Sequence, residues 1–372
     1  MEAGKNMVST AAFVISGLII GAAFGFVLQR GRFCMNSAYR EVLFGDYTLL
    51  RAYLLAVVIT MIGANLIEDL GWLRHMDEAG AVVTGELERQ AFVPWANIIG
   101  GYIFGMGIVL AGGCGSGIVY RIGEGNLVYV VAVFSFFFGI SATKFGTLKP
   151  LYYLLLSIRW PKEGPAPTLY SVLGVNKWVV IAVFSAAFLF FVFQGRPSLK
   201  AKKGYSWSVA GFLVGLIAVA AWWASEYFGG RARGLSFTGP VRELFFTVIF
   251  GNYQNDPSAV VRAESRSVLG VTFSWSAIYV AAVPVGAYLS ARLLHEFGLK
   301  VPPVGDLLRG LYGGFLMGVG AEIGGGCNIG HGLTGVSTLA VSSWVANAFI
   351  FLGDWTMVYF LLIRPLNRQA GS

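Results

Sequence analysis

Apolar residues along this chain of 372 residues gather into long stretches, which short polar or glycine-rich segments separate. A helix needs roughly 20 such residues to cross about 30 Å of hydrocarbon. We predict membrane spans at about 11–29, 48–68, 95–111, 126–143, 177–193, 207–228, 271–293, 306–323 and 336–363. The last stretch is long enough for a break near Gly353 and Asp354. The pattern predicts an all-α polytopic membrane protein with about nine transmembrane helices.

Four further segments, 31–47, 112–125, 233–252 and 324–335, are too short or too polar to span a membrane. They are also too apolar for ordinary loops. Backbone that leaves the helical conformation at membrane depth must find partners inside the protein or in a water-filled cavity. We therefore predict four short re-entrant or broken helices at these positions.

Composition supports a membrane protein, because 56% of the residues are hydrophobic and only 12% are charged. The charged share is about half of the ~25% that is usual in soluble domains. The amino-terminal apolar run is too long for a signal peptide and lacks a convincing cleavage site. We expect it to be the first span.

The net charge of +8 has two readings. Lys and Arg concentrate in cytoplasmic loops of membrane proteins, and a basic field also gathers anionic substrates. The basic residues that would share a cytoplasmic side are Arg30, Arg32, Arg40, Arg51, Arg196, Lys200, Lys202, Lys203, Arg364 and Arg368. The acidic loop at 69–90 would face the other side, which makes the amino end periplasmic and the carboxyl end cytoplasmic. The loops at 144–177 and 229–266 carry basic residues against this orientation.

The chain also resembles itself. Residues 33–42 align with 235–244, and Gly-Gly-Cys114 aligns with Gly-Gly-Cys327. The two copies are separated by an odd number of predicted spans, so the second copy would be inverted in the membrane, as in many transporters. We predict a first repeat at 1–176, a connecting span with a basic loop at 177–206, and a second repeat at 207–372.

The three cysteines, Cys34, Cys114 and Cys327, all lie in the predicted breaks. Their odd number argues against a disulfide framework, and none has a zinc-ligand spacing. Glycines let backbone approach a ligand closely, and helix amino termini favour anions. A thiol adds a weak donor and a polarisable acceptor, which suits an anion with a terminal sulfur. The predicted substrate path therefore contains the cysteines with Gly113, Gly115, Gly326 and Asn328, and Ser236 at the fourth repeat-equivalent position.

Charged residues within the breaks are functional candidates, because charge at membrane depth is costly. We favour structural ion pairs for Arg40 with Glu41 and for Arg242 with Glu243. Glu322 stands equally between helix anchoring and a role in the substrate path or in proton transfer. His331 could gate or relay protons, although a histidine satisfied by local carbonyls is the stronger interpretation. No cofactor, metal or nucleic-acid signature is present.

The motifs Gly-Arg-Phe-Cys34, Gly-Gly-Cys114-Gly-Ser-Gly and Gly-Gly-Gly-Cys327-Asn-Ile-Gly-His-Gly resemble the YeeE/YedE family of sulfur-transport membrane proteins. The resemblance covers nearly the whole chain. It implies thiosulfate uptake across the bacterial inner membrane, with the motif cysteines contacting the ion as it passes. It also implies a small cytoplasmic TusA-like sulfur-carrier protein as a partner.

Three other functions stay open from the residues. The first is a membrane sulfurtransferase or thiol-redox protein that forms a cysteine persulfide. It needs a thiolate beside a cation, for which Arg32 near Cys34 is the local candidate. The second is a glycine-rich anion channel with incidental cysteines. The third is an importer of a selenium compound or of another sulfur-containing anion. The thiosulfate hypothesis requires no covalent intermediate, because weak contacts leave the ion free to move on.

Overall fold

The computed structural model describes residues 9–76, 82–194, 203–255 and 265–370. The predicted basic residues Arg196, Lys200 and Lys202 lie outside these ranges. The longer helices are α1 (Thr10–Arg30), α3 (Thr48–Asp69), α4 (Pro94–Leu110), α6 (Leu127–Lys144), α9 (Lys177–Phe193), α10 (Trp207–Gly229), α11 (Thr238–Phe250), α12 (Trp275–Leu293), α13 (Val304–Gly324) and α14 (Val341–Val358). The shorter ones are α2 (Met35–Val42), α5 (Gly115–Ile122), α7 (Lys149–Leu156), α8 (Leu169–Leu173) and α15 (Arg364–Ala370).

The remaining elements are small. Two π-helical segments cover Ile329–Gly335 and Tyr359–Ile363, and a 3₁₀ turn covers Tyr253–Asn255. Two antiparallel hairpins pair β1 (Arg74–Met76) with β2 (Val82–Thr84), and β3 (Ser265–Val268) with β4 (Val271–Ser274). The fold is therefore all-α apart from these two hairpins in the part of the chain that is described.

Seven helical segments within the described ranges are long and apolar enough to cross a membrane: Thr10–Val42, Thr48–Asp69, Pro94–Ile122, Leu127–Lys144, Trp207–Gly229, Trp275–Leu293 and Val341–Arg368. They confirm the polytopic α-helical class. Helix α9 is a shorter apolar helix, and α13 packs between α4 and α6. The count of nine crossings remains a prediction.

The starts of two predicted spans and one predicted break are wrong. The last span, predicted from residue 336, begins as α14 at Val341. The span predicted at 271–293 begins at Trp275, because residues 271–274 form strand β4 and Ser274 then caps the helix with its side chain. The break near Gly353 and Asp354 is absent from the described chain. Helix α14 continues through both residues to Val358 and changes only there into the π-helical segment.

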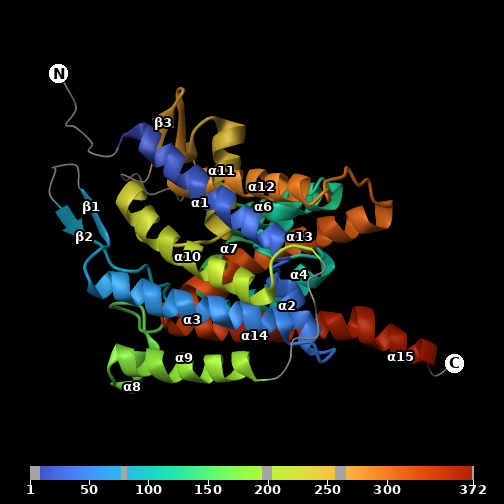
Figure 1. Ribbon diagram of the computed structural model, residues 1–372, viewed down its shortest axis with the longest axis horizontal. Coiled ribbons are helices and arrows are strands. Elements are labelled where there is room, and N and C mark those ends of the chain that lie inside the picture. The colour runs from blue at the N-terminus through green and yellow to red at the C-terminus, as the bar shows by residue number, and fades with distance from the viewer. Residues whose placement is uncertain (1–8, 77–81, 195–202, 256–264, 371–372) are drawn as a thin grey trace.

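The long helices lie side by side, and the two ends of the chain lie at opposite ends of the bundle (Figure 1). We call the end with the start of α1, both hairpins and the start of α14 the N-face. The opposite end, with α2, the start of α3 and α15, is the C-face (Figure 1).

Helix packing is paired across the molecule. Helix α1 packs on α12 as α10 packs on α3, and α4 packs on α14 as α13 packs on α6. At the α4–α13 crossing, a Cβ on Gly107 would lie 2.6 Å from the Met317 nitrogen, and one on Gly320 would lie 2.3 Å from the Phe104 nitrogen. A shift of 213 residues, the same as between Cys114 and Cys327, relates Gly107 to Gly320. The same shift relates Phe104 to Met317, so the two contacts are equivalent in the proposed repeat. Packing of this kind is what an inverted repeat requires, and the repeat is our interpretation of it.

The four predicted breaks contain the short helices α2, α5 and α11 and the π-helical segment Ile329–Gly335. The chain leaves α4 and α13 through Gly112 and Gly325, whose φ angles are 69° and 86°. A side chain is disfavoured in this left-handed region, which explains glycine at both exits. Each exit leads within two residues to a cysteine, Cys114 or Cys327.

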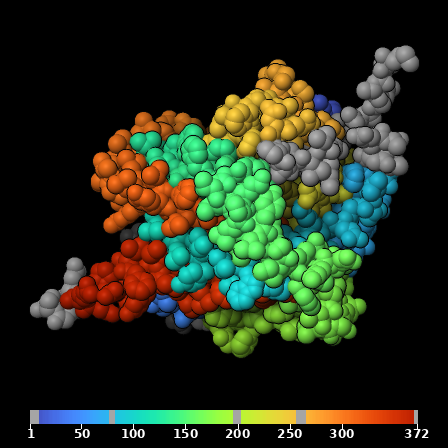
Figure 2. Space-filling view, turned by 180° about the vertical axis from the view of Figure 1, so that it is seen from behind, coloured from blue at the N-terminus to red at the C-terminus, as the bar shows by residue number. Residues whose placement is uncertain are grey.

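The long segment 145–176 lies across the N-face. The Trp160 amide donates to the Phe92 carbonyl at 2.9 Å, and the Leu169 amide donates to the Leu339 carbonyl at 2.9 Å. Figure 2 shows this green segment running from α6 across the molecule toward α9. It ties together the chain before α4 and the chain before α14, and it covers part of the N-face.

Candidate functional site

The three thiols form one row at the centre of the bundle. The Cys34 and Cys114 sulfur atoms lie 3.9 Å apart. A Cβ on Gly117 would lie 3.2 Å from the Cys114 sulfur and 3.3 Å from the Cys34 sulfur, so glycine leaves the space between the two thiols open. A Cβ on Gly115 would lie 3.6 Å from the Cys327 sulfur, which places the third thiol beside the same turn of α5.

The row continues from Cys327 to Ser236. The Gly330 amide donates to the Cys327 sulfur at 3.5 Å. A Cβ on Gly330 would lie 3.1 Å from the Ser236 hydroxyl oxygen and 3.9 Å from the Cys327 sulfur. The order along the row is thus Ser236, Cys327, Cys114 and Cys34, with all three cysteines buried and unoxidised.

Helix amino termini surround the row. Cys34 is the N-cap of α2, and Cys114 is the N-cap of α5. Neither side chain makes a capping hydrogen bond within the described chain. The first amides of both helices therefore need other partners, and their partial positive charge favours an anion. Thiols and amide donors are brought to the same place.

Asn328 adds an unusual polar group. Its side chain is fully buried, and neither its oxygen nor its nitrogen has a hydrogen-bond partner among the described residues. It directly follows Cys327, and the Cys114 thiol is a weak hydrogen-bonding neighbour that does not meet the geometry of a full hydrogen bond. A buried amide without partners costs free energy, so its presence beside the thiols points to a ligand that completes its hydrogen bonds.

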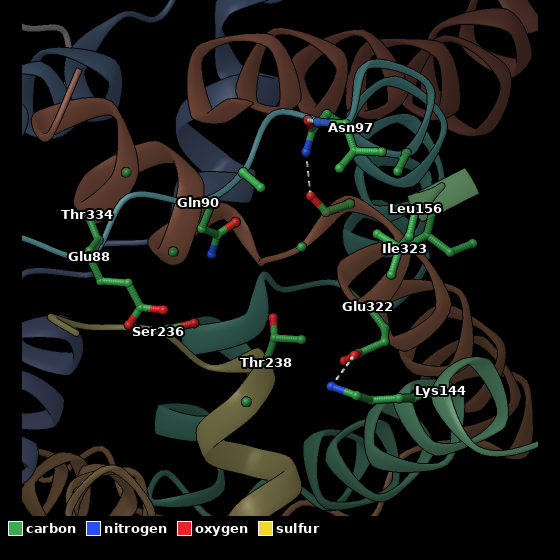
Figure 3. Close-up of a pocket in the computed structure, with 18 of the residues that line it drawn as sticks. Glu88, Gln90, Asn97, Lys144, Leu156, Ser236, Thr238, Glu322, Ile323 and Thr334 are labelled. Atoms are coloured by element: carbon green, nitrogen blue, oxygen red, sulfur yellow. Dashed lines mark hydrogen bonds and ion pairs between the residues drawn. The ribbon is translucent and has the colours of Figure 1, made fainter. Parts of the chain in front are cut away.

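Figure 3 shows a pocket of about 390 Å³, the N-face pocket, whose wall includes Ser236, the first member of the row. Ser236 and Gly330 line it, and both lie beside the Cys327 end of the row. The charged side chains that line it are Lys144, Arg233, Arg242, Glu88 and Glu322. Cations outnumber carboxylates in this lining, which favours the entry of an anion.

Glu322 is held by several groups within the N-face pocket. Lys144 Nζ lies 3.2 Å from its Oε1 atom, and Arg242 Nη1 lies 3.2 Å from its Oε2 atom. Figure 3 shows the Lys144 pair at the pocket wall. Tyr152 of α7 donates a long hydrogen bond of 3.5 Å to the same carboxylate. Burial raises the pKa of the Tyr152 hydroxyl, which keeps it protonated as a donor.

The two ion pairs predicted from the sequence, Arg40–Glu41 and Arg242–Glu243, are arranged differently in the structure. Arg40 lies 3.4 Å from Glu41, a loose pair at the C-face. Arg242 and Glu243 each have another ion-pair partner: Arg242 contacts Glu322, and Arg233 Nη1 lies 2.7 Å from Glu243. These two pairs connect α11 to α13 and to the chain before α11, so they fix the entrance of the N-face pocket.

His331 has the local partners that a structural histidine needs. Its Nε2 atom lies 2.9 Å from the Gly324 carbonyl, and its Nδ1 atom lies 3.1 Å from the Ser343 hydroxyl. A Cβ on Gly326 would lie 3.1 Å from its Nε2 atom, so glycine makes room for the ring. His331 thus braces the glycine-rich turn between α13 and Cys327.

Two pockets open at the C-face. The C-face pocket, about 640 Å³, is lined by Ser37 of α2, Tyr120 and Arg121 of α5, and the charged residues Arg32, Glu41, Glu124, Lys203 and Glu296. Burial raises the pKa of Glu124, although Arg121 opposes the shift. The second C-face pocket, about 390 Å³, includes Asn36, Arg40 and Gly112. The thiol row therefore lies between pockets on opposite faces.

The contacts of Gly113 and Arg32, two further residues named in the sequence analysis, show where they lie. A Cβ on Gly113 would lie 3.3 Å from Arg121 Nη1, so this glycine gives the guanidinium close access to the backbone before Cys114. Arg32, the cation expected near Cys34, pairs with Glu296 at 2.7 Å, and 61% of its side chain is exposed. The sequence interpretation missed Lys144, Arg233 and Tyr152.

Short helices enclosed by long apolar ones, with pockets from both faces that end near one buried polar row, define a polytopic membrane transporter rather than an enzyme. The family model described as "Sulphur transport" matches residues 30–356. The chain belongs to this family, the YeeE/YedE family.

Curated relatives agree with this assignment. The chain is 36% identical over 361 residues to the thiosulfate transporter TsuA of Spirochaeta thermophila, covering 94% of this chain and 99% of that protein. It is 30% identical over 376 residues to the thiosulfate transporter TsuA of Escherichia coli, covering 96% and 97%. A probable transporter, YedE of Escherichia coli, matches 30% of this chain at 30% identity.

Proposed function

We propose that this protein takes up thiosulfate across the bacterial inner membrane, and that the three thiols contact the ion in turn. The row of Cys327, Cys114 and Cys34 between two pockets carries the proposal. The curated relatives that cover nearly the whole chain are named as thiosulfate transporters. We place the amino end in the periplasm, so that the N-face pocket is the entrance and the C-face pocket is the exit.

Each part of the row suits one end of thiosulfate. Its oxygens accept hydrogen bonds from the helix-terminal amides and from the Ser236 hydroxyl, and its terminal sulfur meets the thiols. Weak thiol contacts bind the ion without trapping it, which conduction requires. The ion enters past Lys144 and Arg242, reaches Cys327 beside Gly330, and passes Cys114 and Cys34 to the C-face. No covalent bond forms in this scheme.

Substitution of Cys114 by Ala tests the relay, because this thiol lies between the other two. We expect uptake of radiolabelled thiosulfate into proteoliposomes to fall by at least about tenfold, the loss of roughly 1.4 kcal/mol of stabilisation at the narrowest point. The exposed Ser157→Ala variant is the control and should transport normally. Retained uptake by a correctly folded Cys114→Ala protein would refute the relay.

The rival functions predict different results in the same assay. A glycine-rich anion channel predicts that sulfate competes as well as thiosulfate does, whereas a thiol row favours a terminal sulfur. An importer of selenium compounds predicts that selenite competes best. A sulfurtransferase predicts a stable sulfur adduct on one cysteine, which mass spectrometry of the intact protein would detect after exposure to thiosulfate.

We also propose that a small TusA-like sulfur-carrier protein receives the imported sulfur at the C-face. The support is the family resemblance together with the size and charged lining of the C-face pocket, which includes Arg32 and Lys203. Co-purification of the carrier with the wild-type chain, weakened by charge reversal at Lys203, is the expected result. Equal recovery with both proteins would place the partner elsewhere.

A further inference from the structure

Asp354 of α14 is a buried carboxyl group that the thiol relay does not use. Its side chain is fully inaccessible, and neither carboxyl oxygen has a hydrogen-bond partner among the described residues. It lies 13 residues after the start of α14, which corresponds to about 20 Å along the helix from the N-face. This depth is well inside a membrane span.

An isolated carboxylate in such surroundings is very costly, because neither water nor a donor compensates for the charge. Protonation removes the charge and leaves only a weakly polar group. Ionisable residues inside membrane spans are rare and mark substrate or proton pathways. The surroundings of Asp354 therefore require that it holds a proton in this conformation.

Asp354 lies on the side of α14 that packs on α2. Asn347, Phe351 and Asp354 are spaced by four and three residues, so they share one side of the helix. The Tyr39 hydroxyl of α2 donates to Asn347 Oδ1 at 2.9 Å, and its ring centroid lies 3.7 Å from that of Phe351. Trp355 Nε1 donates to the Tyr39 carbonyl at 3.0 Å. Because α2 begins after its N-cap Cys34, the same short helix connects the thiol row with the side of α14 that carries Asp354, and Cys34 lies within electrostatic range of Asp354.

The charged and titratable groups on the elements around Asp354 are few. Helix α2 and its N-cap carry Cys34, Tyr39, Arg40 and Glu41. Helix α4 carries Tyr102, and α14 carries only Asp354 itself. The two π-helical segments carry His331 and Tyr359. Arg40 is the cation within electrostatic range of Asp354. It lines the second C-face pocket beside Asn36, so the cation nearest to Asp354 also borders a pocket that opens at the C-face.

Two groups of hydrogen-bonded residues lie between the N-face and this region. The Ser343 hydroxyl contacts His331, and the Tyr53 hydroxyl donates to the Gly332 carbonyl at 2.8 Å. Asn347 Nδ2 donates to the Tyr53 hydroxyl at 3.4 Å, and Tyr39 completes the second group. These groups end at Tyr39, which lies within electrostatic range of Asp354 but makes no hydrogen bond to it, and Arg40 on the other side borders the second C-face pocket.

We propose that Asp354 is the proton-binding site of a thiosulfate–proton symporter. The inference rests on the proposed transport function and extends it to the driving force. When thiosulfate occupies the thiol row, α2 shifts, and Arg40 moves from Glu41 toward Asp354. The O–H bond of the Asp354 carboxyl breaks, the proton passes to water in the second C-face pocket, and the carboxylate pairs with Arg40. Reprotonation from the N-face side then restores the first state, with one proton moved inward for each dianion.

The test uses the full chain in proteoliposomes whose membrane potential is clamped to zero. For the wild type, an outside pH one unit lower than the inside should raise thiosulfate accumulation about tenfold, as expected for one proton per ion. The Asp354→Asn variant, which mimics the protonated carboxyl group, should still exchange labelled for unlabelled thiosulfate but should lose the response to the pH gradient. Thr356→Val on the same helix is the matched control and should keep both activities.

The outcomes separate the two proposals. A wild type that exchanges thiosulfate without any response to the gradient overturns proton symport and leaves the transport function intact. A wild type that neither exchanges nor accumulates thiosulfate overturns the transport function itself. A gradient response that survives in Asp354→Asn assigns the proton to another residue and overturns the role of Asp354.

Infrared spectroscopy gives a second readout that does not depend on transport by the variant. The wild type should show a protonated carboxyl band that Asp354→Asn lacks and that Asp354→Glu shifts in frequency. Thiosulfate at high pH should decrease this band. A band that stays unchanged with thiosulfate at every pH would show a permanently protonated structural group and would overturn the proposal, even if the variants transport poorly.

Discussion

At the scale of single residues, the site combines groups that water would normally satisfy with a place that excludes water. Asn328 shows this most clearly, because its buried amide makes no well-formed hydrogen bond within the described chain and has the Cys114 thiol as a weak neighbour. Unsatisfied buried amides cost about 1–3 kcal/mol, so a protein selected for stability alone would replace this residue. We therefore interpret Asn328 as a residue that lowers the stability of the fold and contributes to ligand binding.

Substitution of Asn328 by Leu tests this interpretation. Leu has the same branched shape and number of side-chain heavy atoms but no polar atoms, so we expect thermal stability in detergent to rise by about 1 kcal/mol while thiosulfate uptake falls by about tenfold or more. The matched control is Asn97→Leu. Asn97 accepts from the Val93 amide at 2.9 Å and donates to the Gly324 carbonyl at 2.8 Å. That substitution should lower stability, and a fall with Asn328→Leu as well would show that Asn328 has structural partners.

The cysteine motifs were predictable from the sequence, because thiols beside glycines inside apolar stretches are rare and conspicuous. Asp354 carried a comparable signal, as a lone carboxylate inside an apolar stretch, but its neighbour Gly353 suggested a break in the helix. Lys144 and Arg233 could not be assigned to the pocket from the sequence. Each lies at or near the end of a helix, where a cation usually marks only the edge of the membrane.

At the scale of elements, close approach of α4 and α13 holds the two central breaks together. Gly107 and Gly320 each contact backbone nitrogen atoms of the opposite helix. Small residues allow such helices to approach at backbone distance in a membrane. The glycine-rich exits toward Cys114 and Cys327 follow directly from these helices, so their crossing sets the spacing of the thiol row.

We expect Gly107→Ala and Gly320→Ala to reduce thermal stability by similar amounts, about 1–3 kcal/mol each, because either methyl group collides with backbone that cannot move aside. Gly305→Ala, at the open start of α13, has no atom within 4 Å of the added methyl group and should be neutral. Thermal unfolding of the three variants in detergent measures the effect. Strongly unequal losses at the two crossing positions would argue against the inverted repeat.

The element boundaries show what a hydrophobic pattern can and cannot predict. It located the long helices to within a few residues, because apolar length sets a membrane span. It extended two of them wrongly, at 271–274 and 336–340. Residues 271–274 pair with β3 as a strand, and the chain before Val341 accepts a backbone hydrogen bond from Leu169, so neither stretch continues its helix. Tertiary partners that the local sequence does not reveal determine both boundaries.

At the scale of the whole molecule, the orientation proposed for the bundle places segment 145–176 in the periplasm and α15 in the cytoplasm. The loops at 144–177 and 229–266 carry basic residues that argued against this orientation, and the structure gives two of these residues another explanation. Lys144 and Arg233 line the N-face pocket, so their charge serves the entrance rather than the topology.

Labelling with a membrane-impermeant maleimide checks the orientation. The three natural cysteines are buried, so a thiol introduced at an exposed position should dominate the reaction. Ser157→Cys on the N-face should react in intact cells, and Asn367→Cys on the C-face should react only after the cells are opened. The reverse pattern would invert the topology and exchange the entrance and the exit.

Cys34, Cys114 and Cys327 lie in the layer of protein that separates the N-face pocket from the C-face pocket. Water that fills both pockets would bring the two bulk solutions close together, so most of the transmembrane voltage would fall across this layer. Moving a dianion through it against 100 mV costs about 4.6 kcal/mol. The thiol row is therefore where the resting potential of the cell opposes import most strongly, and a proton that travels with the ion would halve that opposition.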